Sequence, residues 1–196
     1  MVGGADILIQ VEPIELFTER QAIKHETLKR QTGINKAIEI GCTHFIGMDS
    51  DEFYRKDEFL AAKKLVALQP EKHWACQIQV YYKHPTLKLD RLDETWVPFI
   101  CPLPAKTGMR KTNLLIDPTR RTSGKYEVMP NVIMHHYSWV RENGVESKTR
   151  NSTARNNIYQ ADILKEYSDA KEGTVLKYIY SGQRLVRCEN EFNIKD

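Results

Sequence analysis

The spacing of apolar positions changes along the first half of the chain, and each stretch predicts a different element. Ala5–Pro13 has apolar residues at Ile7, Leu8, Ile9 and Val11 and is closed by a proline, which indicates a strand and a loop. From about His25–Ile40 the apolar spacing becomes helical, and Gly41 is a natural end for that helix. Cys42–Met48 then predicts a short buried strand. A second helix is expected over Asp57–Pro70, with the aspartate as its cap and the proline as its end.

Strand patterns dominate the second half of the chain. Trp74–Tyr82 has the clearest one, with apolar and more polar residues alternating at a period of two. Further strands are predicted at Trp96–Ile100, Asn113–Asp117, Val132–Val140 and Thr174–Tyr180, and a helix at Ile158–Ala170. This order of elements predicts an α/β fold whose sheet is mixed in its later part. Because no repeat or linker interrupts it, we expect one domain spanning residues 1–196.

Composition excludes several classes of protein. Hydrophobic residues make up 41% of the 196 residues and charged residues 28%, which excludes wholesale disorder. A net charge of +3 is too small to indicate nucleic acid or a membrane as the main partner. No apolar run approaches the roughly 20 residues of a membrane span, and the start of the chain lacks the pattern of a signal peptide. We therefore expect a cytoplasmic protein without a membrane span.

The cysteines predict free thiols. Cys42, Cys76, Cys101 and Cys188 are far apart, and none of them belongs to a C-x-x-C pair. Zinc sites need close ligand pairs, and disulfide frameworks are usually denser. We therefore expect reduced and mostly buried cysteines.

Two carboxylates directly follow the strand predicted at Cys42–Met48. Asp49 and Asp51 stand two residues apart, so in extended backbone both side chains project to one side and can face one cation. At the carboxyl end of a strand they would lie where open α/β sheets bind ligands. Such hard oxygen ligands favour Mg²⁺ or Mn²⁺. The alternative is an acidic turn in contact with solvent.

The strand predicted at Val132–Val140 brings further candidates. His135 and His136 are adjacent, so they point to opposite faces of a sheet and only one of them can reach a given site. A neutral imidazole would complete a carboxylate site in a way that suits manganese better than calcium. Arg141 could hold a diphosphate or could pair with a carboxylate. The alternative for the histidines is one in the core and one on the surface.

Two polar clusters are candidates for contact with substrate. Asp117–Arg121 follows an apolar stretch. Lys148 lies with Arg150, Asn151 and Ser152 ahead of a predicted helix, where basic side chains and backbone N–H groups together suit phosphate. Such clusters are more often capped turns on a solvated face, which is the alternative for both.

Taken in order, several segments resemble one family. They read LKRQTGINKAIEIGCTHFIGMDSDEFY, CQIQVYYKHPT, WVPFI, IDPTRR, IMHHYSWVR and KTRNSTARNN, between about residues 12 and 160. Together these segments resemble the bacterial and bacteriophage glycosyltransferases related to family 2. The resemblance implies a GT-A-like (Rossmann-like) mixed sheet flanked by helices. It also implies transfer of a sugar from a nucleotide-sugar donor to an acceptor, which could be a glycan, a protein or a modified nucleobase.

The resemblance also implies roles for individual residues. Asp49 and Asp51 match the D-x-D motif, whose Mn²⁺ or Mg²⁺ holds the donor diphosphate. His136, or alternatively His135, matches the late histidine that completes the metal site. Arg30 resembles an arginine that helps to place the donor, and Arg141 a residue beside the leaving diphosphate. Lys148, in the basic cluster described above, is assigned to the donor as well.

The implied reaction needs two kinds of group. Negative charge builds on the leaving diphosphate, where a divalent ion and an arginine can stabilise it. An inverting enzyme also needs a carboxylate base beside the acceptor hydroxyl, for which the candidates are Asp93, Glu94 and Asp117.

One departure from the family is the short stretch ahead of the acidic pair. Only 48 residues precede Asp49, and a βαβ unit takes about 30 residues. The nucleotide-binding half is therefore expected to be shortened at its N-terminal side, leaving a sheet edge that needs a cover. We expect a homo-oligomer or a companion chain. Two alternatives for the function are a non-catalytic transferase remnant or subunit that binds metal and sugar phosphate, and a metal-dependent phosphoesterase.

Overall fold

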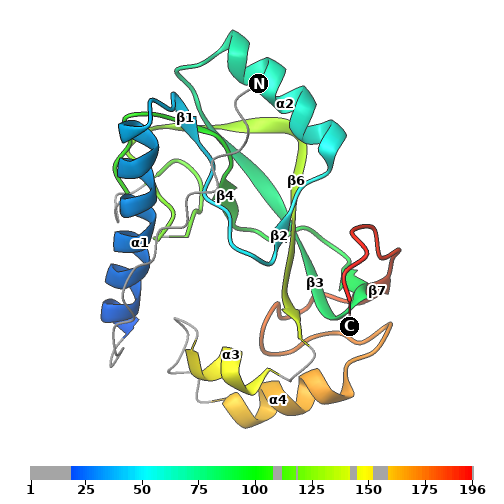
Figure 1. Ribbon diagram of the computed structural model, residues 1–196. Coiled ribbons are helices and arrows are strands. Elements are labelled where there is room, and N and C mark those ends of the chain that lie inside the picture. The colour runs from blue at the N-terminus through cyan, green and yellow to red at the C-terminus, as the bar shows by residue number, and fades with distance from the viewer. Residues whose placement is uncertain (1–18, 108–111, 118, 142–144, 152–158, 196) are drawn as a thin grey trace.

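The computed structural model describes residues 19–107, 112–117, 119–141, 145–151 and 159–195 (Figure 1). These residues form a mixed α/β structure with the elements in the order α1, β1, β2, α2, β3, β4, β5, β6, α3, α4, β7. The α/β class and the mixed sheet predicted from the sequence are confirmed. In the part of the chain described here, no helix is both long and apolar enough to cross a membrane. The strand predicted at Ala5–Pro13 lies outside the described residues.

Five strands form the main sheet. Its path runs β2 (Glu52–Phe53), β6 (Tyr126–Val140), β3 (His73–Leu89), β4 (Trp96–Pro98), and β7 (Leu185–Arg187) also pairs with β3. The long central pair β3–β6 is parallel, whereas β2–β6, β3–β4 and β3–β7 are antiparallel. A separate two-stranded sheet joins β1 (His44–Phe45) to β5 (Cys101–Pro102).

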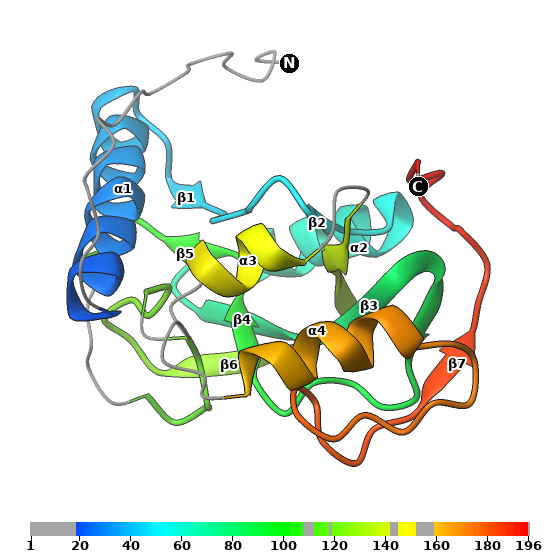
Figure 2. The same cartoon turned by 90° about the horizontal axis from the view of Figure 1, so that it is seen from below.

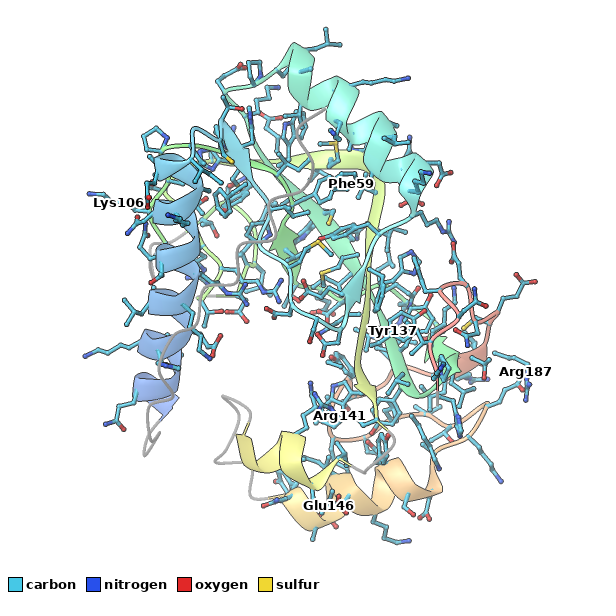
Figure 3. The ribbon with its side chains drawn as sticks, viewed as in Figure 1. Phe59, Lys106, Tyr137, Arg141, Glu146 and Arg187 are labelled. Carbon is cyan, nitrogen blue, oxygen red and sulfur yellow. The ribbon has the colours of Figure 1, made fainter. Side chains whose placement is uncertain are left out.

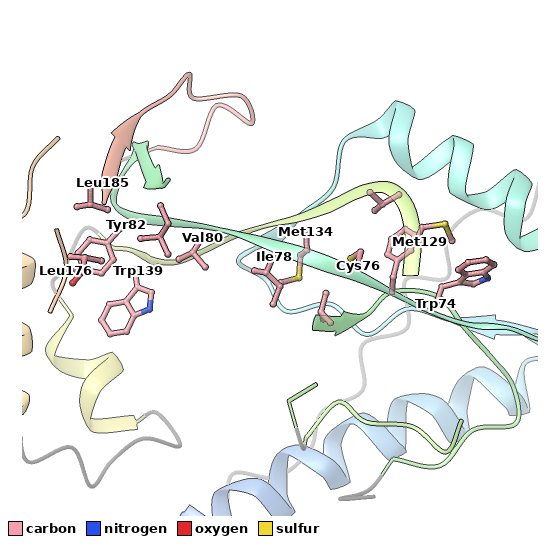
Figure 4. Close-up of a cluster of buried hydrophobic side chains, with 14 of the residues drawn as sticks. Trp74, Cys76, Ile78, Val80, Tyr82, Met129, Met134, Trp139, Leu176 and Leu185 are labelled. Atoms are coloured by element: carbon pink, nitrogen blue, oxygen red, sulfur yellow. The ribbon is translucent and has the colours of Figure 1, made fainter. Parts of the chain in front are cut away.

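Both faces of β3 are covered. Alternate residues from Trp74 to Tyr82 point into the larger core with side chains of β6, as Figure 4 shows. Ala75 on the opposite face belongs to a second, smaller core, and Tyr81 stacks on Tyr137 of β6 with ring centroids 4.0 Å apart. The alternation read from the sequence therefore marks two packed faces, because the residues between the apolar ones are themselves largely buried.

Helix α1 (Glu19–Glu39) ends where the sequence predicts. Gly41 has a φ of +81°, a left-handed conformation that glycine adopts without strain. Its N–H donates to the carbonyl of Ile38, and the N–H of Cys42 donates to the carbonyl of Ala37 at 2.9 Å. These two bonds are the Schellman arrangement that satisfies the last carbonyls of a helix. The helix begins earlier than the predicted His25 and stands at one side of the sheet (Figure 2).

Helix α2 (Lys56–Leu68) covers one face of the sheet and packs on β6. Its N-cap is Arg55, so the predicted cap Asp57 instead lies in the first turn, where its charge complements the helix dipole. Glu58 accepts a hydrogen bond from the backbone N–H of Ile133 at 3.2 Å. Helix α2 is thereby attached to the strand that carries the two histidines.

Some predicted strands are shorter or missing. Of Cys42–Met48 only β1 is a strand, and Asn113–Asp117 contributes a single bridge between Ile116 and Trp96. Thr174–Tyr180 is not a strand, because the chain bends back on itself there. Its turn is closed by a bond from the N–H of Gly182 to the carbonyl of Leu176 at 2.8 Å. The strand that follows is β7.

Two helices close the far end of the sheet. Helix α3 (Glu146–Asn151) forms in the polar stretch that precedes the predicted helix, and α4 (Gln160–Asp169) lies within the predicted Ile158–Ala170. Ile163 and Tyr167 of α4 are buried, and the Tyr167 hydroxyl donates to the carbonyl of Trp139 at 3.1 Å. Helix α4 is thus anchored to the end of β6.

Candidate metal and donor site

Pairing of β2 with β6 brings together residues that are 82 to 86 positions apart. In the antiparallel register Glu52 lies opposite His136 and Phe53 opposite His135. The backbone N–H of Tyr137 also donates to the carbonyl of Asp51 at 2.9 Å. The acidic turn is therefore fixed to the histidine strand through the backbone.

Three side chains converge at this pairing. Ligand atoms of Asp51, Glu52 and His136 all lie within 4.8 Å of one another. His136 Nε2 is 3.8 Å from Asp51 Oδ1. That separation falls inside the interval of about 3–5 Å expected for two ligands of one ion, given metal–ligand bonds near 2 Å. A carboxylate and an imidazole thus stand where they could share a cation.

Asp49 does not belong to this group. The backbone from Asp49 to Glu52 is a turn, in which the N–H of Glu52 donates to the carbonyl of Asp49 at 3.2 Å and the N–H of Asp49 to Glu52 Oε2 at 3.0 Å. The expectation that Asp49 and Asp51 face one side assumed extended backbone, which this turn does not have. The Asp49 carboxylate accepts instead from Arg30 Nη2 at 3.0 and 3.1 Å and from Arg120.

Arg120 is the central cation of the site. Its guanidinium donates to both oxygens of Glu52, one of them at 3.0 Å, and to Asp49. The side chain of Glu52 has no exposed surface and that of Arg120 is 11% exposed. Sequence reasoning placed Arg120 only in a general polar cluster and did not assign Glu52 as a ligand. The one feature of the sequence that could have indicated Glu52 is its position directly after Asp51.

The two histidines point to opposite faces, as adjacent strand residues do. His135 Nδ1 is 2.8 Å from the hydroxyl of Tyr81, on the face away from Asp51. Burial lowers the pKa of His135 to about 4 and also lowers the pKa of His136, although Asp51 and Glu52 oppose that shift for His136. His136 is therefore neutral at neutral pH, the form in which an imidazole binds a metal.

Lys148 lies close enough to Asp51 and Asp49 for their negative charges to act on it. Lys148 of α3 lies over the ring of Trp139, 5.0 Å from its centroid, and burial together with Arg141 lowers the pKa of Lys148 to about 8. Arg141 donates through Nε to the carbonyl of Ser138 at 2.9 Å, and Figure 3 shows it at the end of β6 nearest α3. Burial alone would raise the pKa of Asp49, but Arg120 and Arg30 together lower it. Asp49 is therefore fully ionised at neutral pH.

A cavity of about 400 Å³ lies between α1 and the segment leading to the acidic turn. Its apolar wall includes Ile34, Phe45 and Pro98, and Arg30, Asp49 and Arg120 also line it. The cavity thus adjoins the acidic turn, with cations at its border.

The three candidate bases lie in different places. Asp93 accepts from the N–H and the hydroxyl of Thr95 at 2.8 and 2.7 Å, which closes a local turn. Asp117 makes the same pair of bonds with Thr119, both at 2.7 Å, and its carbonyl accepts from the N–H of Arg120. Glu94 is exposed just before β4. Of the three, only Asp117 belongs to the loop that enters the acidic group.

Among the described residues, Asp51, Glu52 and His136 form a group that could hold a metal ion. Asp51 and His136 offer one oxygen and one nitrogen, a mixed set that suits manganese. Glu52 would add a second carboxylate, but both of its oxygens already accept from Arg120. Asp51 and His136 are therefore the residues that could hold an ion, and Glu52 lies beside them with both oxygens bonded to Arg120.

Comparison with known proteins found no matching family model, no matching curated protein and no matching solved structure.

Proposed function

We propose that this chain is a metal-dependent glycosyltransferase that moves a sugar from a nucleotide-sugar donor to an acceptor. The observation that carries the proposal is the 3.8 Å approach of His136 to Asp51 across two paired strands. The ordered resemblance to the family-2 transferases supplies the reaction class, and we further propose that the mixed sheet is a shortened GT-A sheet.

Each residue of the site has a separate task in this reaction. A bound Mn²⁺ or Mg²⁺ would act as a Lewis acid toward the donor diphosphate. Asp51 and His136 hold that ion, while Arg141 and Lys148 offer positive charge to the leaving diphosphate. Arg30 and Arg120 fix the turn and close one side of the cavity of about 400 Å³, which has room for the nucleoside.

Asp117 is the base that we favour for the acceptor hydroxyl. Its loop also carries Arg120 into the site, whereas Asp93 closes a turn ahead of β4 and Glu94 is exposed beside it. Both bonds from Thr119 go to Oδ1 of Asp117, so Oδ2 is the oxygen that would accept the proton. A carboxylate in this role increases the nucleophilicity of the acceptor oxygen as the bond to the donor breaks.

Hydrolysis of nucleotide sugars without an acceptor tests this function. A panel of uridine, guanosine, cytidine and deoxythymidine donors is incubated with Mn²⁺ or with EDTA, and release of the free nucleotide is measured. We expect slow, metal-dependent release of the nucleoside diphosphate from one donor class, and loss of that release in Asp51→Asn. Asp57→Asn, which removes an exposed carboxylate from α2, is the matched control and should keep it.

Other outcomes of the same assay contradict the proposal. Binding of metal without release from any donor would indicate a non-catalytic remnant or subunit. Metal-dependent cleavage of simple phosphate esters such as p-nitrophenyl phosphate, at the same or a higher rate, would indicate a phosphoesterase.

A further inference from the structure

The last described residues, Cys188–Lys195, form a segment that lies on the sheet face opposite the metal site. We call it the C-terminal segment; it follows β7 and is red in Figure 1. Glu52 and His136 point to one face of the β2–β6 pair, and Phe53 and His135 point to the other. The C-terminal segment covers the second face.

Phe192 is the main apolar contact of this segment. Its ring meets that of His135 edge-on with centroids 4.9 Å apart, and it lies 5.4 Å from the ring of Phe53 and 6.1 Å from that of Tyr137. Phe53 also meets Tyr137 edge-on at 5.5 Å. Phe192 therefore contacts both β2 and β6 on the face opposite the metal site.

An ion pair attaches the same segment to the end of β2. Arg55, two residues after Phe53, donates from Nη2 to Glu191 Oε2 at 2.9 Å and from Nε to Oε1. Two parallel bonds between a guanidinium and a carboxylate fix orientation as well as distance. Arg55 is also the N-cap of α2, so Glu191 holds the junction between β2 and that helix.

The segment has a structure of its own. The N–H of Cys188 donates to the carbonyl of Thr86 at 2.9 Å, which continues the attachment of β7 to β3. The Asn190 amide then bonds the backbone of Ile194 in both directions, at 2.8 and 3.0 Å. Phe192 and Glu191 thus project from a closed turn.

Strand β2 needs such support. It has two residues, and among the described strands it pairs with β6 alone. Strands this short are marginal by themselves, and a one-residue slip would move Glu52 and Asp51 away from His136.

We propose that Glu191 and Phe192 are positioning residues. From the face opposite the metal site they hold β2 in register with β6, and so keep Asp51 and Glu52 beside His136. That these residues hold β2 in place is inferred from the contacts described here. That their loss weakens metal binding rests on the function proposed above. In the described structure the two residues contact Arg55, Phe53, His135 and Tyr137, and not Asp51, Glu52 or His136.

Hydrogen exchange tests the placement directly. In the full chain carrying Glu191→Gln together with Phe192→Ala, amides of residues 51–54 and of Tyr137 should exchange on the order of tenfold faster than in wild type. Amides in the middle of β3, such as that of Ile78, should keep their wild-type rates. Glu189→Gln, an exposed carboxylate of the same segment, is the matched control and should change neither set.

Mn²⁺ titration of the same variants tests the consequence. We expect the Kd to rise about tenfold in the double variant, which is typical when the support of a ligand is lost. Ile163→Val, a core change in α4, should lower the thermal midpoint without changing the Kd.

Two outcomes of the exchange experiment overturn the proposal. Unchanged exchange at residues 51–54 would show that the segment does not hold β2, and equally faster exchange throughout the sheet would show a general stabilising role. If wild type binds no Mn²⁺, the proposed function fails while the exchange result still decides whether the segment holds β2.

Discussion

The carboxylate of Glu52 has no contact with solvent, and the guanidinium of Arg120 balances its negative charge. Desolvation of a charge costs several kcal/mol unless a partner and hydrogen bonds offset it. Arg120 supplies both and extends to Asp49, which Arg30 also binds. At the scale of single residues, the acidic turn depends on these two arginines for its shape.

Replacement of Arg120 should therefore destabilise the fold. Arg120→Gln leaves Glu52 buried without a cation, and we expect the free energy of unfolding in urea to fall by about 3–5 kcal/mol. Arg91→Gln, at an exposed position, should change it by less than about 0.5 kcal/mol. Adding Glu52→Gln to Arg120→Gln should recover part of the loss, because the uncompensated charge is removed. Equal stability of Arg120→Gln and wild type would refute this role.

The cysteines give a second prediction at this scale. All four are free, and burial raises the pKa of Cys76 and of Cys101 to about 12 each. Since only the thiolate reacts, these two thiols should not react with Ellman's reagent at pH 8 in the folded protein. The exposed Cys42 should react at once. Rapid titration of all four thiols without denaturant would contradict the described packing.

At the scale of elements, helices were easier to predict than strands. Gly41 and Pro70 lie just beyond the ends of α1 and α2, because helix ends are set by local backbone chemistry. The apolar run before Asp49 predicted seven strand residues, but a strand also needs a partner, and only His44–Phe45 has one in the described structure. Adjacent histidines could be assigned to opposite faces from the period of two alone. The position of Arg120 beside Glu52 could not be predicted, because Arg120 belongs to a loop that is distant from Glu52 in the sequence.

The Arg55–Glu191 pair makes the attachment of the C-terminal segment depend on pH. Hydrogen bonds from Arg55 lower the pKa of Glu191 below its ordinary 4.5. A lowered carboxyl pKa contributes stability that is complete above pH 4.5 and is lost as pH falls through the lower value of the folded state. We expect the NMR signals of the Phe192 ring to report detachment of the segment in that acidic range. The adjacent His135, whose pKa burial lowers to about 4, titrates in the same range and is still present in Glu191→Gln. Glu191→Gln should therefore keep only the change that His135 imposes on the Phe192 ring and lose the detachment; an identical transition in that variant would contradict the assignment.

At the scale of the whole molecule, the sequence predicts a homo-oligomer or a companion chain. An apolar cavity of about 740 Å³ opens beside β1, lined by Phe45, Ile46, Phe59 and Val66 among others. Covering such a surface by a second copy would bury it from water. Light scattering should then give at least a dimer, and Ala67→Glu on the cavity wall should shift it to monomer, whereas Lys64→Glu should not. A monomer at high concentration would contradict this expectation.

The α/β class and mixed sheet followed from the order of elements, since apolar periodicity is visible in a single sequence. The parallel register of β3 with β6, and the two packed faces of β3, depend on contacts between distant segments. The candidate site divides in the same way. Asp51 and His136 could be paired from the ordered resemblance, whereas the turn that directs Asp49 to the arginines exists only in three dimensions.

Titration of Mn²⁺, followed by electron paramagnetic resonance of the free ion, tests the central claim most directly. The site described here predicts one Mn²⁺ bound per wild-type chain and affinity at least about tenfold weaker in Asp51→Asn and in His136→Ala. His135→Ala should lower the affinity less than His136→Ala, because its ring points to the other face. Titration curves for Asp51→Asn and His136→Ala that coincide with wild type, in variants that remain folded, would remove the metal site and with it the proposed transferase.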